Sequence, residues 1–280
     1  VTFSGGTAKA IDVNNGAETF SGLTINKGNA IDLTVAASDT LTVTGTLTLT
    51  NGDLMQATIP ATGTIAAQGN ITANSGFDTG HTSRIEITGS ANQTFTGGGS
   101  TSAGGVPEIE IDKSGGTLTL SSIIRFNNAN GTYWTYTAGT VDATTNDSTV
   151  VWAGSGSEIL DGQGTSATMA FDNFQVGGPT ATLGGNFDVD GNVTITGSAG
   201  GLDTSSSNYS VNVAGNWTND CTSTVCFVSN SSTVTFDGSA NATLTTGGTA
   251  AQYDFQTLTI NKSGGAIVTL ATNGLDVDGT

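Results

Sequence analysis

The chain has 280 residues, a formal net charge of −17 and only 10% charged residues, with six Lys plus Arg against 23 Asp plus Glu. This balance argues against nucleic acid and anionic membrane surfaces as partners, because both require clustered cations. The apolar residues alternate with Thr, Ser and Asp in short runs, which is not the pattern of an acidic disordered chain. No apolar run approaches the roughly 20 residues that a membrane helix requires.

Two short segments recur together four times along the chain. The first copy has VTFSG at residues 1–5 and LTINK at residues 23–27. The later copies begin at Ile85 and Ile109, at Val150 and Phe174, and at Val234 and Leu258. An internal repeat of this kind predicts a repeat architecture before any other feature is considered.

The spacing of these copies predicts a solenoid. Their first segments lie 84, 65 and 84 residues apart, and a coil of stacked turns can drop one turn cleanly, whereas an independent domain seldom loses about a fifth of its length. With roughly 21 residues per turn, the intervals correspond to four, three and four turns. Runs that alternate with a period of two, such as residues 41–44 and 193–196, supply the short strands of each turn.

We therefore expect an all-β repeat protein, one continuous parallel β-solenoid over residues 1–280, with almost no helix. The sequence repeats lie at about 1–84, 85–149, 150–233 and 234–280, the last one incomplete. Stacked at ~4.8 Å per turn, roughly 13 turns give a rod on the order of 60 Å long. The alternative architecture is a row of tandem immunoglobulin-like β-sandwiches, because ~84 residues is near the size of one such domain.

The style of the repeat resembles that of known surface proteins. The run LTVTGTLTLTNG at residues 41–52, the Gly-Asn corners and the alternation of VTFDGS with LTINKSGG carry this resemblance. They are similar to the β-helical stalks of bacterial secreted surface proteins, namely autotransporter passenger domains and filamentous-haemagglutinin-like adhesins. The resemblance covers nearly the whole chain. It implies a right-handed parallel β-helix, secretion, and a role in adhesion or in a surface layer or filament, and it carries over no catalytic residues.

These features together predict a non-enzymatic, extracellular structural protein at the cell surface, a subunit or segment of a filament, stalk or surface layer. We expect adhesion and self-association into a homo-oligomer or filament through end-to-end or lateral contacts, with glycans as a further class of partner. The sequence starts on a repeat strand at Val1 and stops partway through a repeat at Thr280, so either the natural polypeptide continues or copies pack end to end. The alternative from another class is a glycan-binding or polysaccharide-cleaving β-helix.

Two pairs of carboxylates lie at the ends of predicted strands. Asp188 and Asp190 precede one turn, and Asp276 and Asp278 precede the corresponding turn of the last repeat. Calcium takes oxygen ligands from such loops, but the spacing of an EF-hand is missing and the first repeat has threonines in these places. We expect solvent-facing carboxylates and no cofactor, with weak calcium binding as the alternative.

The few basic residues are candidate sites of chemistry. Lys27, Lys113 and Lys262 share one repeat position, and we expect them to be solvated corner residues or partners of nearby carboxylates. His81 and Arg84 lie in an inter-strand turn, where a surface loop is expected rather than a catalytic pair. No Gly-x-Ser-x-Gly elbow occurs with a histidine and an acid in reach, so no catalytic residue is predicted.

Cysteine and asparagine residues complete the candidates. Cys221 and Cys226 are the only cysteines and can close a small disulfide, with two free thiols as the alternative. A disulfide favours an oxidising, extracellular setting. Sequons that permit glycosylation in a suitable organism occur at Asn70, Asn92, Asn192, Asn216 and Asn241.

Overall fold

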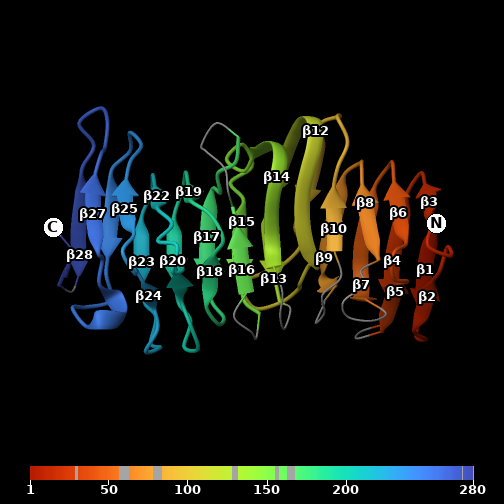
Figure 1. The fold of residues 1–280 in the computed structure, drawn as a ribbon, viewed down its shortest axis with the longest axis horizontal. Helices are drawn as coiled ribbons and strands as arrows, with labels where there is room; N and C mark the ends of the chain where they lie inside the picture. Colours follow the sequence, from red (N-terminus) through yellow and green to blue (C-terminus); the bar gives the residue numbers. More distant parts are fainter. Residues whose placement is uncertain are drawn as a thin grey trace.

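The computed structural model describes residues 1–28, 31–56, 63–77, 84–127, 132–154, 158–162, 168–272 and 274–279. These residues form an elongated β-solenoid of about ten turns, with the N-terminus and the C-terminus at opposite ends (Figure 1). The chain advances along the axis one turn at a time, so the sequence order is also the order along the rod.

Three ladders of parallel strands form the sides of the solenoid, and the chain visits them in the order first, second, third. The first side contains β1 (Thr2–Gly5), β4 (Leu23–Lys27), the start of β7 (Leu47–Gln56), β9 (Ile71–Phe77), β11 (Gln93–Thr96), the ends of β12 (Glu108–Ser121) and β14 (Thr132–Asp142), β19 (Phe187–Val189), β22 (Val211–Val213), β25 (Thr233–Phe236) and β27 (Thr257–Ile260). The second side contains β2 (Lys9–Ile11), β5 (Asp32–Val35), the end of β7, β13 (Ile123–Phe126), β15 (Thr149–Trp152), β17 (Asn173–Val176), β20 (Val193–Ile195), β23 (Trp217–Asn219), β26 (Ala242–Thr245) and β28 (Val268–Thr272). The third side contains β3 (Ala17–Phe20), β6 (Thr40–Val43), β8 (Thr64–Ala67), β10 (Arg84–Ile87), the starts of β12 and β14, β16 (Glu158–Asp161), β18 (Ala181–Leu183), β21 (Leu202–Asp203) and β24 (Phe227–Val228).

The parallel pairing confirms the predicted solenoid and rules out the alternative of immunoglobulin-like sandwiches, whose sheets are antiparallel. Most turns are longer than the predicted 21 residues, although their length varies. Thr24 pairs with Thr48 and Thr48 with Thr72, which is 24 residues per turn, whereas the turn from Phe174 to Val193 takes 19. The rod therefore has fewer turns than the roughly 13 that the sequence predicts, and at ~4.8 Å per turn its stacked length is on the order of 50 Å.

The repeated segment pair is not in step with the turns. The two members of each pair lie in register one turn apart, as Thr2 and Thr24, Ile85 and Ile109, Val150 and Phe174, and Val234 and Leu258. The four pairs occupy the first, third, second and first sides in that order. Each interval is thus one side short of a whole number of turns, so the prediction of four, three and four complete turns is wrong.

The core is a single column of apolar side chains. Along β6, for example, Leu41 and Val43 are fully buried while the intervening Thr42 is partly exposed, which is the period of two expected of a strand with one inward face. Aromatic rings stack in the middle of the column, where Trp134 packs on Phe171 and Trp152 on Phe174.

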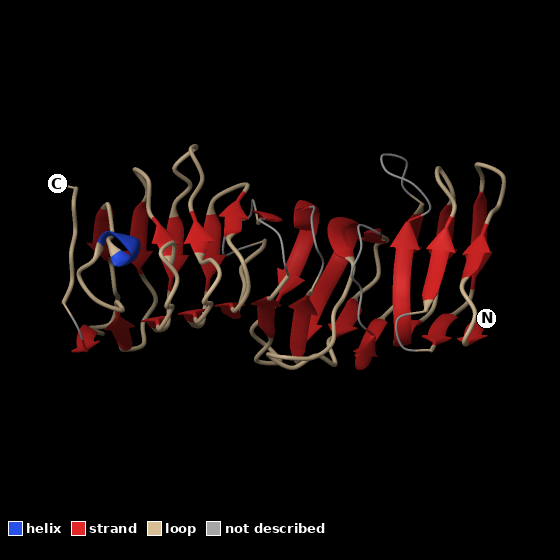
Figure 2. Ribbon diagram, turned by 90° about the horizontal axis from the view of Figure 1, so that it is seen from below, coloured by secondary structure: helices blue, strands red, loops and turns tan. Residues whose placement is uncertain are grey.

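Regular helix is almost absent from the described residues. The structure has one short 3-10 helix, η1 (Ala251–Tyr253), near the C-terminal end of the rod (Figure 2). Among the described residues, none forms a helix long and apolar enough to span a membrane.

Candidate functional site

Three carboxylates from adjacent turns meet at the last described turn. Phe255 forms a parallel bridge with Val277, and its N–H donates to the carbonyl oxygen of Asp276 at 3.1 Å. This register places Asp254 beside Asp276. One carboxylate oxygen each from Asp254, Asp276 and Asp278 lies within 4.8 Å of the other two. The sequence singled out Asp276 and Asp278 but not Asp254, which lies one turn earlier, directly after η1.

Asp254 is the buried member of this cluster. Its side chain is 9% exposed, and its Oδ1 has no hydrogen-bond partner among the described residues. Burial, followed by the negative charges of Asp276 and Asp278, raises the pKa of the Asp254 carboxyl group. Like charges on paired strands repel, so a proton or a cation that reduces the charge would stabilise this arrangement.

The corresponding carboxylates of the third repeat form no such cluster. Phe171 forms a bridge with Val189 as Phe255 does with Val277, so Ala170 occupies the position of Asp254. Asp188 is buried rather than solvent-facing, which corrects the prediction for that residue. Burial and the nearby Asp237 raise the pKa of Asp190.

The recurring lysines reach back to the backbone of earlier turns. Lys27 and Lys113 are buried, at 2% and 3% exposure. The Lys27 ammonium donates to the carbonyl oxygen of Ser4 at 3.2 Å, that of Lys113 to Ala91 at 2.9 Å, and that of Lys262 to Ala214 at 2.6 Å. The prediction of solvated corner residues is therefore wrong for Lys27 and Lys113. Burial lowers the pKa of Lys113 and of Lys262.

A glycine accompanies each of these lysines one turn earlier. Gly5 is the register partner of Lys27, and Gly89 and Gly238 hold the same place before Lys113 and Lys262. All three glycines have positive φ, between 75° and 92°, a conformation that L side chains rarely adopt. The carbonyl oxygens of this corner face the lysine, so the recurring lysine stabilises the corner by donating hydrogen bonds to them.

The third repeat has no lysine at this corner. Gly178 stands where the other repeats have lysine, and a Cβ atom there would lie 2.7 Å from the backbone carbon of Ala153. A lysine at this position would collide with the preceding turn, so the corner closes by direct backbone approach instead.

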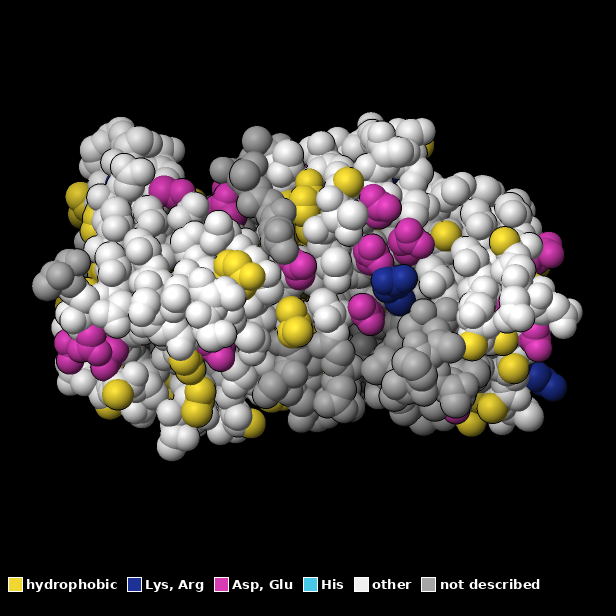
Figure 3. Space-filling view, viewed as in Figure 1, with side chains coloured by type: hydrophobic (Ala, Val, Ile, Leu, Met, Phe, Trp, Pro, Cys, Tyr) yellow, Lys and Arg dark blue, Asp and Glu magenta, His cyan; other side chains and the backbone are white. Residues whose placement is uncertain are grey.

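A charged cluster lies on the third side. Arg84 forms an ion pair with Glu110, and Arg84 is the register partner of Glu108. Burial raises the pKa of Glu108 to about 7. The positive charge of Arg84 opposes this rise, and the negative charge of Glu110 adds to it. Figure 3 shows basic side chains beside several carboxylates near the middle of the face that it draws, with further carboxylates elsewhere on this face. Glu108 can therefore hold a proton near neutral pH. His81, the other candidate of the predicted turn, lies outside the described residues.

The sequon asparagines have a structural role. The side-chain oxygen of each accepts a hydrogen bond from a backbone N–H one turn later. The pairs are Asn70 with Thr94, Asn92 with Thr117, Asn192 with Asn216, Asn216 with Thr243, and Asn241 with Ile267, at 2.8–3.1 Å. Each of these N–H groups lies one residue before the pairing with the preceding turn begins, so without the asparagine it would have no acceptor there. This role explains why asparagine recurs at the corners without invoking glycosylation.

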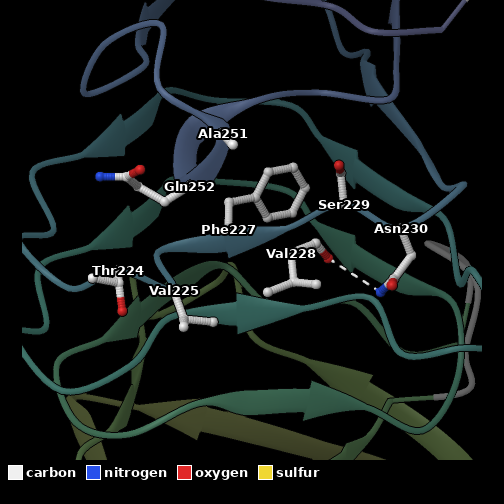
Figure 4. Close-up of a pocket in the computed structure, with 8 residues that line it drawn as sticks. All are labelled: Thr224, Val225, Phe227, Val228, Ser229, Asn230, Ala251 and Gln252. Atoms are coloured by element: carbon white, nitrogen blue, oxygen red, sulfur yellow. Dashed lines mark hydrogen bonds between the residues drawn. The ribbon is translucent and has the colours of Figure 1, made fainter.

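A disulfide joins Cys221 to Cys226 and closes the loop between β23 and β24. Both cysteines are buried. Closing so small a loop lowers the conformational entropy of the unfolded chain and stabilises the native state by about 2 kcal/mol. A groove lies between this loop and η1, lined by Thr224, Val225, Phe227, Val228, Ser229, Asn230, Ala251 and Gln252 (Figure 4). The groove contains no titratable side chain among these residues, so it offers no acid or base for catalysis.

No family model, curated protein or solved structure matches this chain. The fold and the side-chain clusters described above are therefore the features from which a function can be inferred.

Proposed function

We propose that this chain is a non-enzymatic structural segment of an extracellular surface filament, stalk or layer, and that copies of it associate end to end. The observation that carries the proposal is the single continuous stack of parallel ladders, whose terminal strand edges in the described rod can pair with a further turn of the same polypeptide or of another copy. At one end, β1, β2 and β3 each pair on one edge only, with β4, β5 and β6. At the other end, β27 and β28 pair only with β25 and β26.

The two ends match each other side by side. β1 opens the first side and β27 closes it, while β2 opens the second side and β28 closes it. Stacking the first turn of one copy on the last turn of another would therefore continue both ladders in parallel. Such a head-to-tail contact uses two different surfaces, and it generates an open filament when its rotation does not close a ring.

Apolar side chains at the last described turn are open to the same kind of further turn, whether it belongs to this polypeptide or to another copy. Ile260 is 53% exposed and Leu270 is 44% exposed, although their counterparts in earlier turns are buried. An unpaired strand edge with apolar neighbours is a template for another strand. Fully burying an exposed side chain of this size contributes about 1.5–3 kcal/mol, so covering one that is half exposed contributes about 1 kcal/mol, and a few of them support association.

The extracellular setting is supported by the disulfide and by the scarcity of cations. Disulfides persist in oxidising compartments and are rare in the cytosol. A net charge of −17 with a surface of Thr, Ser and Asn keeps the sides of a rod soluble while its ends associate.

Sedimentation velocity over a range of concentrations tests the proposal. Wild-type chain at about 100 μM is expected to form linear assemblies. Leu270→Lys, which places a charge on the end surface, is expected to weaken association at least about tenfold. Val225→Lys is the matched control, because Val225 is similarly exposed but lies in the disulfide loop on the side of the rod. Monomers at every concentration, or equal loss in both variants, would refute end-to-end association.

A glycan-cleaving β-helix is the second candidate, and the charged cluster on the third side is the observation that favours it. A carboxyl group with a pKa near 7 beside further carboxylates is suited to general acid catalysis. If this candidate holds, polysaccharides incubated with the chain will gain reducing ends, and Glu108→Gln will abolish the gain. If wild-type chain releases none, the cluster has a structural role.

A further inference from the structure

We propose that Asp254, Asp276 and Asp278 form a binding site for one divalent cation of the calcium type at the last described turn. The site joins two successive turns of the solenoid, because Asp254 belongs to one turn and the other two carboxylates to the next. A bound cation would therefore fasten the last turn to the one before it. This inference is independent of end-to-end association.

The distances between the carboxylates fit a hard cation. Calcium binds oxygen ligands at about 2.4 Å, so two of its ligands are at most about 4.8 Å apart. One oxygen each from Asp254, Asp276 and Asp278 satisfies this limit with respect to the other two. The exposed side of the cluster, at Asp278, leaves room for water molecules to complete the six to eight ligands that calcium takes.

The buried carboxylate points to a ligand independently of the clustering. Asp254 is more than nine-tenths buried, and its Oδ1 lacks a hydrogen-bond partner within the described part of the chain. A buried polar group without a partner is destabilising, and a buried carboxylate more so. Neither Asp276 nor Asp278 can donate to it when ionised, and no described Lys or Arg forms an ion pair with any of the three.

The position is specific to the last repeat. Thr19 and Ala170 hold the place of Asp254 in the first and third repeats, as the register of Phe20 with Val43 and of Phe171 with Val189 shows. The fold therefore does not need a carboxylate there. A cation bound in the last repeat would account for the burial of Asp254 against two further acids.

Three carboxylates with water as the remaining ligands predict a weak site. Calcium sites of extracellular modules have dissociation constants of about 0.1–1 mM, and we expect this range here. Mg²⁺ is expected to bind more weakly, because it requires near-octahedral geometry and loses its water reluctantly.

Calorimetric titration of the full chain with Ca²⁺ tests the site. A buffer with about 0.15 M KCl screens diffuse binding to the acidic surface. Wild type is expected to bind one Ca²⁺, and Asp254→Asn to weaken binding at least about tenfold. Asp190→Asn is the matched control, since this carboxylate holds the place of Asp278 in the third repeat, where Ala170 replaces the buried acid. Its affinity is expected to stay within about twofold of wild type.

A second measurement keeps the proposal falsifiable if Asp254→Asn does not fold. The unfolding midpoint of wild type is expected to rise with Ca²⁺ and to fall with a chelator, and Asp278→Asn is expected to abolish this response. No heat and no shift up to about 10 mM Ca²⁺ would overturn the proposal, because a shared proton would then account for the cluster. An equal loss of binding in Asp190→Asn would also overturn the proposal, because it would show that Ca²⁺ affinity depends on the overall charge and not on this cluster.

Discussion

The asparagine ladder along the corner between the first and second sides makes a quantitative prediction. The side chain of Asn192 donates from Nδ2 to Oδ1 of Asn173 at 2.8 Å. Its own Oδ1 accepts the N–H of Asn216 at 2.9 Å. Asn192→Ala removes both hydrogen bonds and leaves the Asn216 N–H without its acceptor.

The expected loss follows from these two contacts. A hydrogen bond contributes about 0.5–1.5 kcal/mol net, and an orphaned donor costs more when it is buried. Asn192 is only partly buried, so water replaces some of what is lost. We expect the free energy of unfolding to fall by about 1–2 kcal/mol. Asn212→Ala is the control, because Asn212 lies on β22 with similar burial and no side-chain hydrogen bond to the described residues.

Urea denaturation followed by circular dichroism measures the global effect, and hydrogen exchange of the Asn216 amide measures the local one. Stability in a solenoid is nearly additive along its axis, so exchange should accelerate near the mutated corner and remain unchanged at distant turns. A loss no greater than that of Asn212→Ala, within about 0.5 kcal/mol, would refute the ladder as a source of stability.

Two further predictions concern buried charge. Lys113→Met keeps the apolar stem but removes the ammonium from its backbone carbonyl acceptors, so urea denaturation should show a free energy of unfolding lower by about 1–3 kcal/mol. Lys9 is exposed, so Lys9→Met should change this free energy very little. Equal losses in the two variants would contradict a structural role of Lys113. The pKa of Glu108 is raised to about 7 from an ordinary 4.5, so the native state keeps a proton that the unfolded chain releases between these values. Stability should therefore fall as pH rises from about 4.5 to 7 and then level off, by at most about 3 kcal/mol and less because the group is partly solvated. Glu108→Gln should flatten this pH profile, and an unchanged profile would show that the raised pKa is not the cause.

The strands and the class of fold follow from local patterns, because alternation of apolar and polar residues needs only neighbours in sequence. The same alternation carries the signal for the buried lysines. Lys113 has the parity of Ile109 and Ile111, which both point inward along β12, and Lys27 continues the inward series of β4 in the same way. Parity therefore predicts an inward lysine, whereas the expectation of a solvated residue relied on charge alone.

The number of turns predicted from the sequence is too high for a geometric reason. Dividing the intervals of 84 and 65 residues into whole turns gives roughly 21 residues per turn. The repeated pair is a local unit of two stacked strands that fits any side, and successive copies shift by one side. Counted as one side short of four, three and four turns, the same intervals agree with turns of about 23–24 residues, close to the 24 residues from Thr24 to Thr48.

The acidic cluster could be predicted only in part. Asp276 and Asp278 are two residues apart on one extended segment, so their proximity is local. Asp254 joins them only because the turn length sets Phe255 against Val277, and that length varies from turn to turn. The sequence carries no local mark of this contact, although the correspondence between repeats places Asp254 where Ala170 and Thr19 stand.

Electron microscopy of the purified chain tests the central claim most directly, namely that this solenoid is a structural segment that extends by end-to-end stacking. The account predicts unbranched filaments one solenoid wide, in which copies on the order of 50 Å long follow one another. The filaments should be lost in Leu270→Lys and kept in Val225→Lys. Dispersed single rods at all concentrations, together with polysaccharide-degrading activity that depends on Glu108, would contradict it.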